Sequence, residues 1–239
     1  MTNARRHGAA PNPEMEGLAG ARAASPSSRA ALRELIGSIQ LCASCPTMCG
    51  QGGILRAVGA RVQRPIMFVA EAPGRLGALK TGLPLSGDVS GENFEALLRH
   101  AGWTRRDVWV TNAVLCWPAS PEGNNRSPSR AELTNCVQYL RTQIALVRPI
   151  VVAPLGVAAL SALNLLSPVQ SLLLRTAVAR PQPWLGRYLF PLYHPSPRVV
   201  NTCRRMPQQR ADFRALSRFA QVLSRSLFHG GVPQPLASY

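Results

Sequence analysis

The sequence predicts an α/β fold in which helices cover both faces of a parallel sheet. Short apolar runs of strand length alternate along the chain with longer segments of helical periodicity. The chain has 239 residues, 46% of them hydrophobic, which is enough apolar material for one ordinary core. No apolar run approaches the ~18–20 residues of a membrane-spanning helix, and none near the N-terminus is typical of a secretory signal. We therefore expect a soluble, cytoplasmic protein.

The predicted elements follow one another in order. A helix begins after Ser27 or Ser28 and runs through Ile39 into a group of cysteines. The apolar run Ile66–Ala70, bounded by prolines, is typical of a strand buried on both faces of a parallel sheet. The later elements are a helix over residues 91–101, a strand over 108–111, a helix over 129–147 that starts with a capping box of Ser129 and Glu132, a strand over 150–153, a helix over 156–163, a strand over 188–192 and an arginine-rich helix over 207–227.

Two terminal segments are expected to lie outside this fold. Residues 1–28 repeat Gly, Ala, Pro and Ser without a sustained apolar period, and residues 229–239 have a similar composition. We predict that both are disordered tails. Residues 29–228 then form one domain.

Three loops leave the carboxyl ends of predicted strands, over residues 71–88, 112–116 and 194–198. In open α/β sheets, ligands bind beyond the carboxyl ends of the strands. We therefore expect these loops to converge on one site.

The chain is strongly basic, with 27 Lys and Arg against 11 Asp and Glu and a formal net charge of +16. Lys80 is the only lysine, and residues 151–239 contain one acidic side chain, Asp212. A basic face suits a polyanionic partner such as a nucleic acid. Arginine richness can also reflect a GC-rich genome, so charge alone does not establish function.

Four of the six cysteines form a candidate metal site. Cys42 and Cys45 have the C-x2-C spacing that lets two thiolates reach one metal or cluster, Cys116 directly follows a predicted strand, and Cys136 lies in the next helix. Both an iron–sulfur cluster and zinc fit such a set. Cys49 and Cys203 are expected to be small buried hydrophobic residues.

Several short motifs occur in a recognisable order. They are Ala72-Pro73-Gly74, Lys80-Thr81-Gly82, Gly87-Asp88-Val89-Ser90-Gly91, Thr111-Asn112-Ala113-Val114, His194-Pro195-Ser196 and Asn201-Thr202. Over roughly residues 40–225, this set resembles the uracil-DNA glycosylase superfamily, most of all the iron–sulfur enzymes of family 5, with some features of family 4.

The resemblance implies a three-layer α/β/α fold with a central four-stranded parallel sheet, and makes residues 29–228 the catalytic domain. It implies a structural [4Fe–4S] cluster held by Cys42, Cys45, Cys116 and Cys136, with zinc as the alternative. The implied activity is that of a monofunctional DNA glycosylase, which flips uracil or another damaged base out of DNA and hydrolyses its N-glycosidic bond. Such an enzyme acts as a monomer, away from membranes, and in a bacterium it would be associated with the nucleoid. The alternative is a catalytically weak or inactive module that binds lesions.

The resemblance also assigns roles at the base. His194 would donate a hydrogen bond to the uracil O2 region and stabilise the leaving anion. The side-chain amide of Asn112 can pair with both N3–H and O4 of uracil. The backbone at Ala72 and Gly74 would approach the flipped base. Asp88 is the preferred group to stabilise the cationic sugar.

Two features depart from the family pattern. Leu85 stands where a phenylalanine normally stacks on the flipped uracil, and leucine has no π-face, so we expect a looser pocket that accepts other bases. Glu71 stands where family 4 has glutamate, but the loop after Gly74 lacks a water-activating carboxylate. The segment from Cys116 to Cys136, in which residues 118–125 are rich in Pro, Gly and Asn, is also longer than the family norm.

Contacts with DNA are expected on both sides of the base. Lys80 and Ser86 lie in the loop after the first strand, and Ser196, Arg198 and Arg204 lie in or after the histidine motif. A lyase needs an amine nucleophile, and we expect Lys80 to lie near a phosphate instead. The enzyme should therefore leave an abasic site without cutting the strand.

Overall fold

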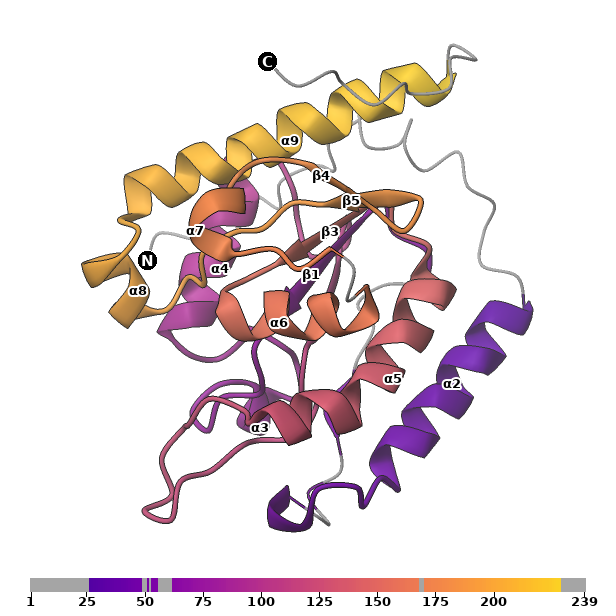
Figure 1. Ribbon diagram of the computed structural model, residues 1–239, viewed down its shortest axis with the longest axis vertical. Coiled ribbons are helices and arrows are strands. Elements are labelled where there is room, and N and C mark those ends of the chain that lie inside the picture. The colour runs from indigo at the N-terminus through magenta and orange to yellow at the C-terminus, as the bar shows by residue number, and fades with distance from the viewer. Residues whose placement is uncertain (1–25, 49–50, 52, 56–61, 168–169, 229–239) are drawn as a thin grey trace, which may run out of the picture.

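A mixed sheet lies between two layers of helices (Figure 1). The computed structural model describes residues 26–228 apart from 49–50, 52, 56–61 and 168–169. The two predicted tails lie outside the described residues except for 26–28, which belong to helix α2 (Pro26–Gln40). No helix in these described segments is long and apolar enough to cross a membrane.

The sheet has five strands in the order β2-β1-β3-β5-β4. The four predicted parallel strands are confirmed as β1 (Ile66–Ala70), β2 (Trp109–Asn112), β3 (Val151–Pro154) and β5 (Arg187–Leu189). The edge strand β4 (Gln182–Trp184) is antiparallel to β5 and was not predicted. It has three residues, one of them Pro183, and so shows no apolar alternation.

Helices cover both faces, as predicted. On one face, α2, α5 (Arg130–Val147) and α6 (Val157–Leu166) share a core cluster with Met67 and Val69 of β1. On the other face, α4 (Val89–His100) and α9 (Met206–Phe228) pack on Phe68, whose ring stacks on Phe213 with centroids 5.5 Å apart. Every residue of β1 is buried, which explains its continuous apolar sequence.

The capping box predicted at the start of α5 is present. The Ser129 hydroxyl accepts a hydrogen bond from the Glu132 backbone, and the Glu132 carboxylate accepts one from the Ser129 backbone. The short elements were not predicted because each is too short to show a period. They are η1 (Pro46–Met48), α3 (Ala78–Thr81), α7 (Leu174–Ala177) and α8 (Pro197–Thr202).

The strand order places the topological switch point of the sheet between β1 and β3. The chain leaves β1 through α4 on one face to reach β2, and leaves β3 through α6 on the other face to reach β5. Because these connections diverge, the carboxyl ends of β1 and β3 are open to a ligand. The loops predicted to form the site begin at this edge.

Candidate active site

The first loop stays paired with its neighbour after the strands end. The Ala113 N–H donates to the Ala70 carbonyl at 2.8 Å, and the Val114 N–H donates to the Glu71 carbonyl at 3.1 Å. Glu71 and Ala72 are partly buried here. The structure therefore brings two predicted base-binding residues alongside the segment that follows Asn112.

Asp88 is held against the glycines of this loop. Its Oδ1 accepts a hydrogen bond from the Gly91 N–H at 2.9 Å and caps α4. A Cβ at Gly77 would lie 2.4 Å from the other carboxylate oxygen, and a Cβ at Gly74 would lie 3.2 Å from it. Glycine at 77 is therefore required for the close approach of the Asp88 carboxylate.

Asn112 is the most informative side chain of the site. It is the last residue of β2 and is 1% exposed. Its Oδ1 and Nδ2 are both buried, and neither has a hydrogen-bond partner among the residues that the structure describes. Leaving a buried polar group unpaired costs about 1–3 kcal/mol. A ligand that offers one donor and one acceptor to this amide would remove that penalty.

His194 lies at the carboxyl end of β3. A Cβ at Gly156, which has a φ of 94°, would lie 3.3 Å from the His194 Cβ, so the loop after β5 passes directly over the start of α6. Burial lowers the pKa of His194 to about 4, while the charge of Asp88 acts in the opposite direction. The imidazole is therefore neutral at pH 7, with one N–H available to donate.

One partly buried amide, Asn93, and one buried amide, Gln209, hold the histidine loop, and the sequence analysis missed both. Asn93 of α4 donates from Nδ2 to the Pro195 carbonyl at 2.8 Å. Gln209 of α9 is 1% exposed and donates from Nε2 to the Arg204 carbonyl at 2.9 Å and the His194 carbonyl at 3.5 Å. Gln209 stands in the apolar stripe of α9, and a polar residue at such a position was the available signal.

Leu85 is 8% exposed and packs in the cluster that includes Phe94. Its φ is 49°, in the left-handed region that costs a leucine about 1–2 kcal/mol. The backbone carbonyls of Pro84 and Leu85 accept hydrogen bonds from Arg105, which also pairs with Glu95. These contacts offset the strain and fix the backbone.

The predicted DNA contacts have different surroundings. Lys80 and Arg198 are exposed, and Ser86 and Ser196 are partly buried. Arg204 forms two hydrogen bonds to Asp212, at 2.9 and 2.6 Å. A phosphate contact by Arg204 would therefore have to use its remaining N–H groups.

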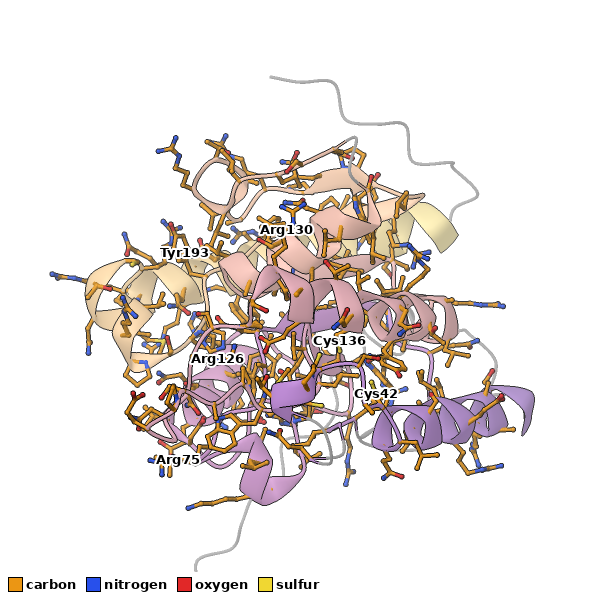
Figure 2. The ribbon with its side chains drawn as sticks, turned by 60° about the horizontal axis from the view of Figure 1, so that its bottom comes forward. Cys42, Arg75, Arg126, Arg130, Cys136 and Tyr193 are labelled. Atoms are coloured by element: carbon orange, nitrogen blue, oxygen red, sulfur yellow. The ribbon has the colours of Figure 1, made fainter. Side chains whose placement is uncertain are left out.

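The long segment after β2 contacts the loop after β1. The Asn125 Oδ1 accepts hydrogen bonds from the Arg75 backbone at 3.0 Å and from the Trp117 indole at 2.9 Å. Figure 2 shows Arg75 and Arg126 on the same side of the molecule. Asn125 thus joins the two loops beside the candidate base pocket.

The four candidate cysteines line one cavity together with Met48 and Tyr139. Figure 2 shows Cys42 and Cys136 close together, where the end of α2 meets α5. Two of the sulfurs accept hydrogen bonds: Cys136 from the Leu115 N–H at 3.4 Å, and Cys45 from Asn135 at 3.5 Å. In the described segments, no three or more His, Cys, Asp or Glu side chains are arranged to hold a single metal ion.

The thiols of this cavity differ in acidity. Burial, with a smaller contribution from the charges of the neighbouring cysteines, raises the pKa of Cys116 to about 11 and that of Cys136 to about 12. Burial also opposes ionisation of Cys42, but hydrogen bonds with Tyr139 and Ser44 outweigh it and lower the pKa of Cys42. The prediction for Cys203 was wrong, because this residue is exposed at the end of α8. Cys49 lies outside the described residues.

Glu132 connects the two halves of the cysteine site, which the sequence analysis did not foresee. Its carboxylate accepts hydrogen bonds from Arg126 at 2.8 and 2.6 Å, from the Ser129 N–H at 2.8 Å, and from the Thr47 hydroxyl at 3.4 Å. Thr47 lies in η1, directly after Cys45 and Pro46. The hydrogen bonds from Arg126 lower the pKa of Glu132 to about 2.

Replacing Glu132 with glutamine is expected to lower the free energy of unfolding by about 2–3 kcal/mol, because Arg126 loses its charged partner. In the wild type, this stabilisation is present above the ordinary carboxyl pKa and is lost as the pH falls toward about 2. Urea unfolding at pH 7 and pH 3 measures both effects. Glu122→Gln, at an exposed position, is the control. Equal stabilities of the two variants at pH 7 would contradict the assignment.

Comparison with known proteins places the chain in a family. The profile of the Uracil DNA glycosylase superfamily matches residues 57–217. A type-4 uracil-DNA glycosylase of Thermotoga maritima is 33% identical over 170 residues, which are 70% of this chain and 83% of the relative. A type-5 uracil-DNA glycosylase of Pyrobaculum aerophilum is 34% identical over 153 residues, 58% of this chain and 64% of the relative. Another type-4 uracil-DNA glycosylase, of Archaeoglobus fulgidus, is 34% identical over 125 residues, 52% of this chain and 59% of the relative.

The match to the profile covers most of the described fold and includes β1, β2, β3 and β5 with the loops that follow them. Relatives of both type 4 and type 5 agree with the mixed pattern of motifs. The chain belongs to the uracil-DNA glycosylase superfamily.

Proposed function

We propose that this protein is a monofunctional uracil-DNA glycosylase, which hydrolyses the N-glycosidic bond of uracil in DNA and leaves an abasic site. The observation that carries the proposal is the buried, unpaired amide of Asn112 at the carboxyl edge of the sheet. Uracil offers N3–H to the Asn112 oxygen and O4 to its amide nitrogen, whereas cytosine has no N3–H. The named relatives favour excision over the lesion-binding alternative.

His194 stabilises the leaving base in this mechanism. Cleavage of the glycosidic bond moves negative charge onto the uracil, and a donor in place before the reaction stabilises this charge without reorganisation. The neutral imidazole donates through its N–H and does not need to transfer a proton. Asn93 and Gln209 hold the backbone of this loop, so they act as positioning residues.

The sugar becomes cationic as the bond breaks, and Asp88 is the carboxylate best placed to stabilise it. The negative charge of Asp88 acts on His194, so the two groups lie near each other. Glu71 follows β1 at the same edge of the sheet. Water is the nucleophile in the proposed hydrolysis. A lyase reaction would need an amine instead, and Lys80 is exposed on α3.

The cysteine cavity fits an iron–sulfur cluster in its donor set. Cys42, Cys45, Cys116 and Cys136 would hold it, and N–H groups already point at two of the sulfurs. Such a group would supply a crosslink between the segment after α2, the loop after β2 and α5. The freshly purified protein should be brown, whereas a zinc protein would be colourless.

A glycosylase of this kind would work on the chromosome, in the cytoplasm and in the nucleoid of a bacterium, and a monomer is sufficient for it. The exposed Lys80 and Arg198 and the partly buried Ser86 and Ser196 are proposed to contact the DNA backbone. Arg204 would contribute through the N–H groups that Asp212 leaves free.

The proposal is tested with a panel of labelled DNA substrates. The duplexes carry uracil opposite G, A or C, hypoxanthine, ethenocytosine or mismatched thymine, and a single strand carries uracil. We expect alkali-labile abasic sites from the uracil substrates, with no strand cleavage before alkali. Binding of uracil-containing DNA without release of any base would overturn the enzyme assignment and support the lesion-binding module.

Leu85→Phe is expected to narrow the substrate range. A phenylalanine at position 85 would stack on a flipped base, and such stacking contributes about 0.5–1.5 kcal/mol. The ratio of uracil to hypoxanthine excision should therefore rise several-fold. Single-turnover rates on the two substrates measure the ratio. The control is Leu79→Phe, which changes an exposed leucine on α3. Leu98→Phe is unsuitable because Leu98 is fully buried. An unchanged excision ratio in Leu85→Phe would show that Leu85 does not contact the flipped base.

A further inference from the structure

A second pocket lies at the opposite end of the sheet from the active site. Its volume is about 250 Å³, and it is lined by Arg141 and Ile144 of α5, Leu166 of α6, and Trp184, Leu185 and Arg187 of the β4–β5 hairpin. Because β5 begins at Arg187, the hairpin turn lies at the amino ends of the parallel strands. A ligand bound here would therefore not compete with a base in the active site.

Three hydrogen-bond donors of this pocket lack an acid partner. Trp184 is 3% exposed, and its Nε1 is buried without an acceptor in the described residues. Arg187 is partly buried and contacts the carbonyls of Leu185 and Pro149, both at 3.4 Å. Neither Arg187 nor Arg141 is in an ion pair with a described residue. A desolvated guanidinium without a carboxylate is a favourable place for an anion.

Leu185 adds an apolar and strained element. The hairpin turn consists of Leu185 and Gly186, with φ values of 44° and 72°. Both central residues of such a turn have positive φ, and Asn, Asp or Gly is preferred there. A leucine in this conformation, with 56% of its surface exposed, is unfavourable unless its side chain has a partner.

The chemistry of the pocket selects an apolar side chain flanked by carboxylates. Residues 13–18 of this chain have that pattern: Glu14 and Glu16 stand on either side of Met15, and they are the acidic residues that precede Glu34. The charges of the two glutamates match those of the two arginines of the pocket.

The position of α2 places this segment within reach. The end of α2 lies beside the first half of α5, where Asn135 donates to the Ser44 carbonyl at 2.8 Å. The two helices pack side by side (Figure 1), so the beginning of α2 lies toward the end of α5 that carries Arg141. The ten residues from Glu16 to Pro26 can span up to roughly 33 Å.

We propose that residues 13–18 bind in this pocket, with Met15 on the apolar wall and the two glutamates on Arg141, Arg187 and the Trp184 indole. Docking would hold the N-terminal segment at the end of the sheet opposite the active site. It would also satisfy the donors that the described residues leave unpaired. The proposal does not depend on the catalytic activity.

A labelled peptide of residues 11–20 tests the proposal. It is added to a full-length variant whose own segment is disabled by Glu14→Gln, Met15→Ser and Glu16→Gln, and binding is followed by fluorescence anisotropy. We expect saturable binding, at least about tenfold tighter than that of a scrambled peptide of the same composition. Wild-type protein should bind the peptide more weakly than the disabled variant, because its own segment competes.

Substitutions in the disabled variant locate the binding site. Arg141→Gln and Trp184→Phe should each weaken peptide binding about tenfold, since each removes one hydrogen bond to a carboxylate. Arg130→Gln removes the same charge at the other end of α5 and should have no effect. Arg141 is exposed, so its variant remains decisive if Trp184→Phe does not fold. Equal binding of the scrambled peptide, equal effects of Arg141→Gln and Arg130→Gln, or equal affinity of wild type and disabled variant would overturn the proposal.

Discussion

Asn112→Asp is expected to lower the rate of uracil excision by at least ~10³-fold. A carboxylate has no donor for uracil O4 and would repel it, so the site would lose one hydrogen bond and gain a repulsive contact. The same carboxylate can accept a hydrogen bond from the exocyclic amine of cytosine. The residual activity should therefore shift in preference from uracil toward cytosine.

Single-turnover kinetics with saturating enzyme separate this effect from DNA binding. Asn164→Asp is the matched control, because it makes the same chemical change on α6, where Asn164 contacts the Leu172 backbone. The control should excise uracil at close to the wild-type rate. If Asn112→Asp also retains that rate, Asn112 does not contact the base.

His194→Ala is the second large effect, and we expect the chemical step to slow by ~10²–10³-fold with little change in the affinity for uracil-containing DNA. This is the usual consequence of removing one donor from a developing anion. His194→Gln, which keeps an N–H donor, should recover part of the rate. Affinity and rate falling together would indicate a role in holding the DNA instead.

The pH dependence distinguishes a neutral donor from a general acid. Because the pKa of His194 is about 4, its protonation state does not change between pH 5.5 and 8, and the single-turnover rate should not follow a histidine titration there. A general acid with an ordinary pKa would lose activity as the pH rises through 6.5.

The stability of the protein should also depend on pH through His194. In the unfolded chain His194 binds a proton more readily than in the folded protein, so the wild type should lose stability as the pH falls from about 6.5 toward 4. The His194→Gln variant should lose less stability over the same pH range.

Local patterns were sufficient for most of the secondary structure. The fully buried β1 and the capping box at Ser129 each have a short-range signature that tertiary contacts reinforce. The strand β4 has no such signature, because its place is set by pairing with β5. The same distinction explains Cys203, whose exposure depends on where α8 ends relative to α9.

Candidate site residues that stand in motifs could be named from the sequence, whereas residues that hold the backbone of the site could not. His194, Asn112 and Asp88 stand in recognisable motifs, and the structure places each at the carboxyl edge. Asn93 and Gln209 donate to carbonyls of a loop that is distant or offset in sequence, so their partners could not be read from the sequence, although a polar residue in the apolar stripe of α9 marked Gln209. The pairing of Arg204 with Asp212 could be recognised only once α9 was in place, although Asp212 is the single acidic residue after position 150.

The Thr47–Glu132 contact has a consequence for the order in which the protein assembles. It joins segments 85 residues apart, and α5 packs in the core cluster that contains Met67 of β1 and Trp109 of β2. Closing so long a loop costs conformational entropy, and contacts formed around it must offset that cost. The four thiols therefore meet late in folding, and a metal group would be inserted into a nearly finished protein. A chain that is still leaving the ribosome would expose Cys42 and Cys45 well before their partners exist.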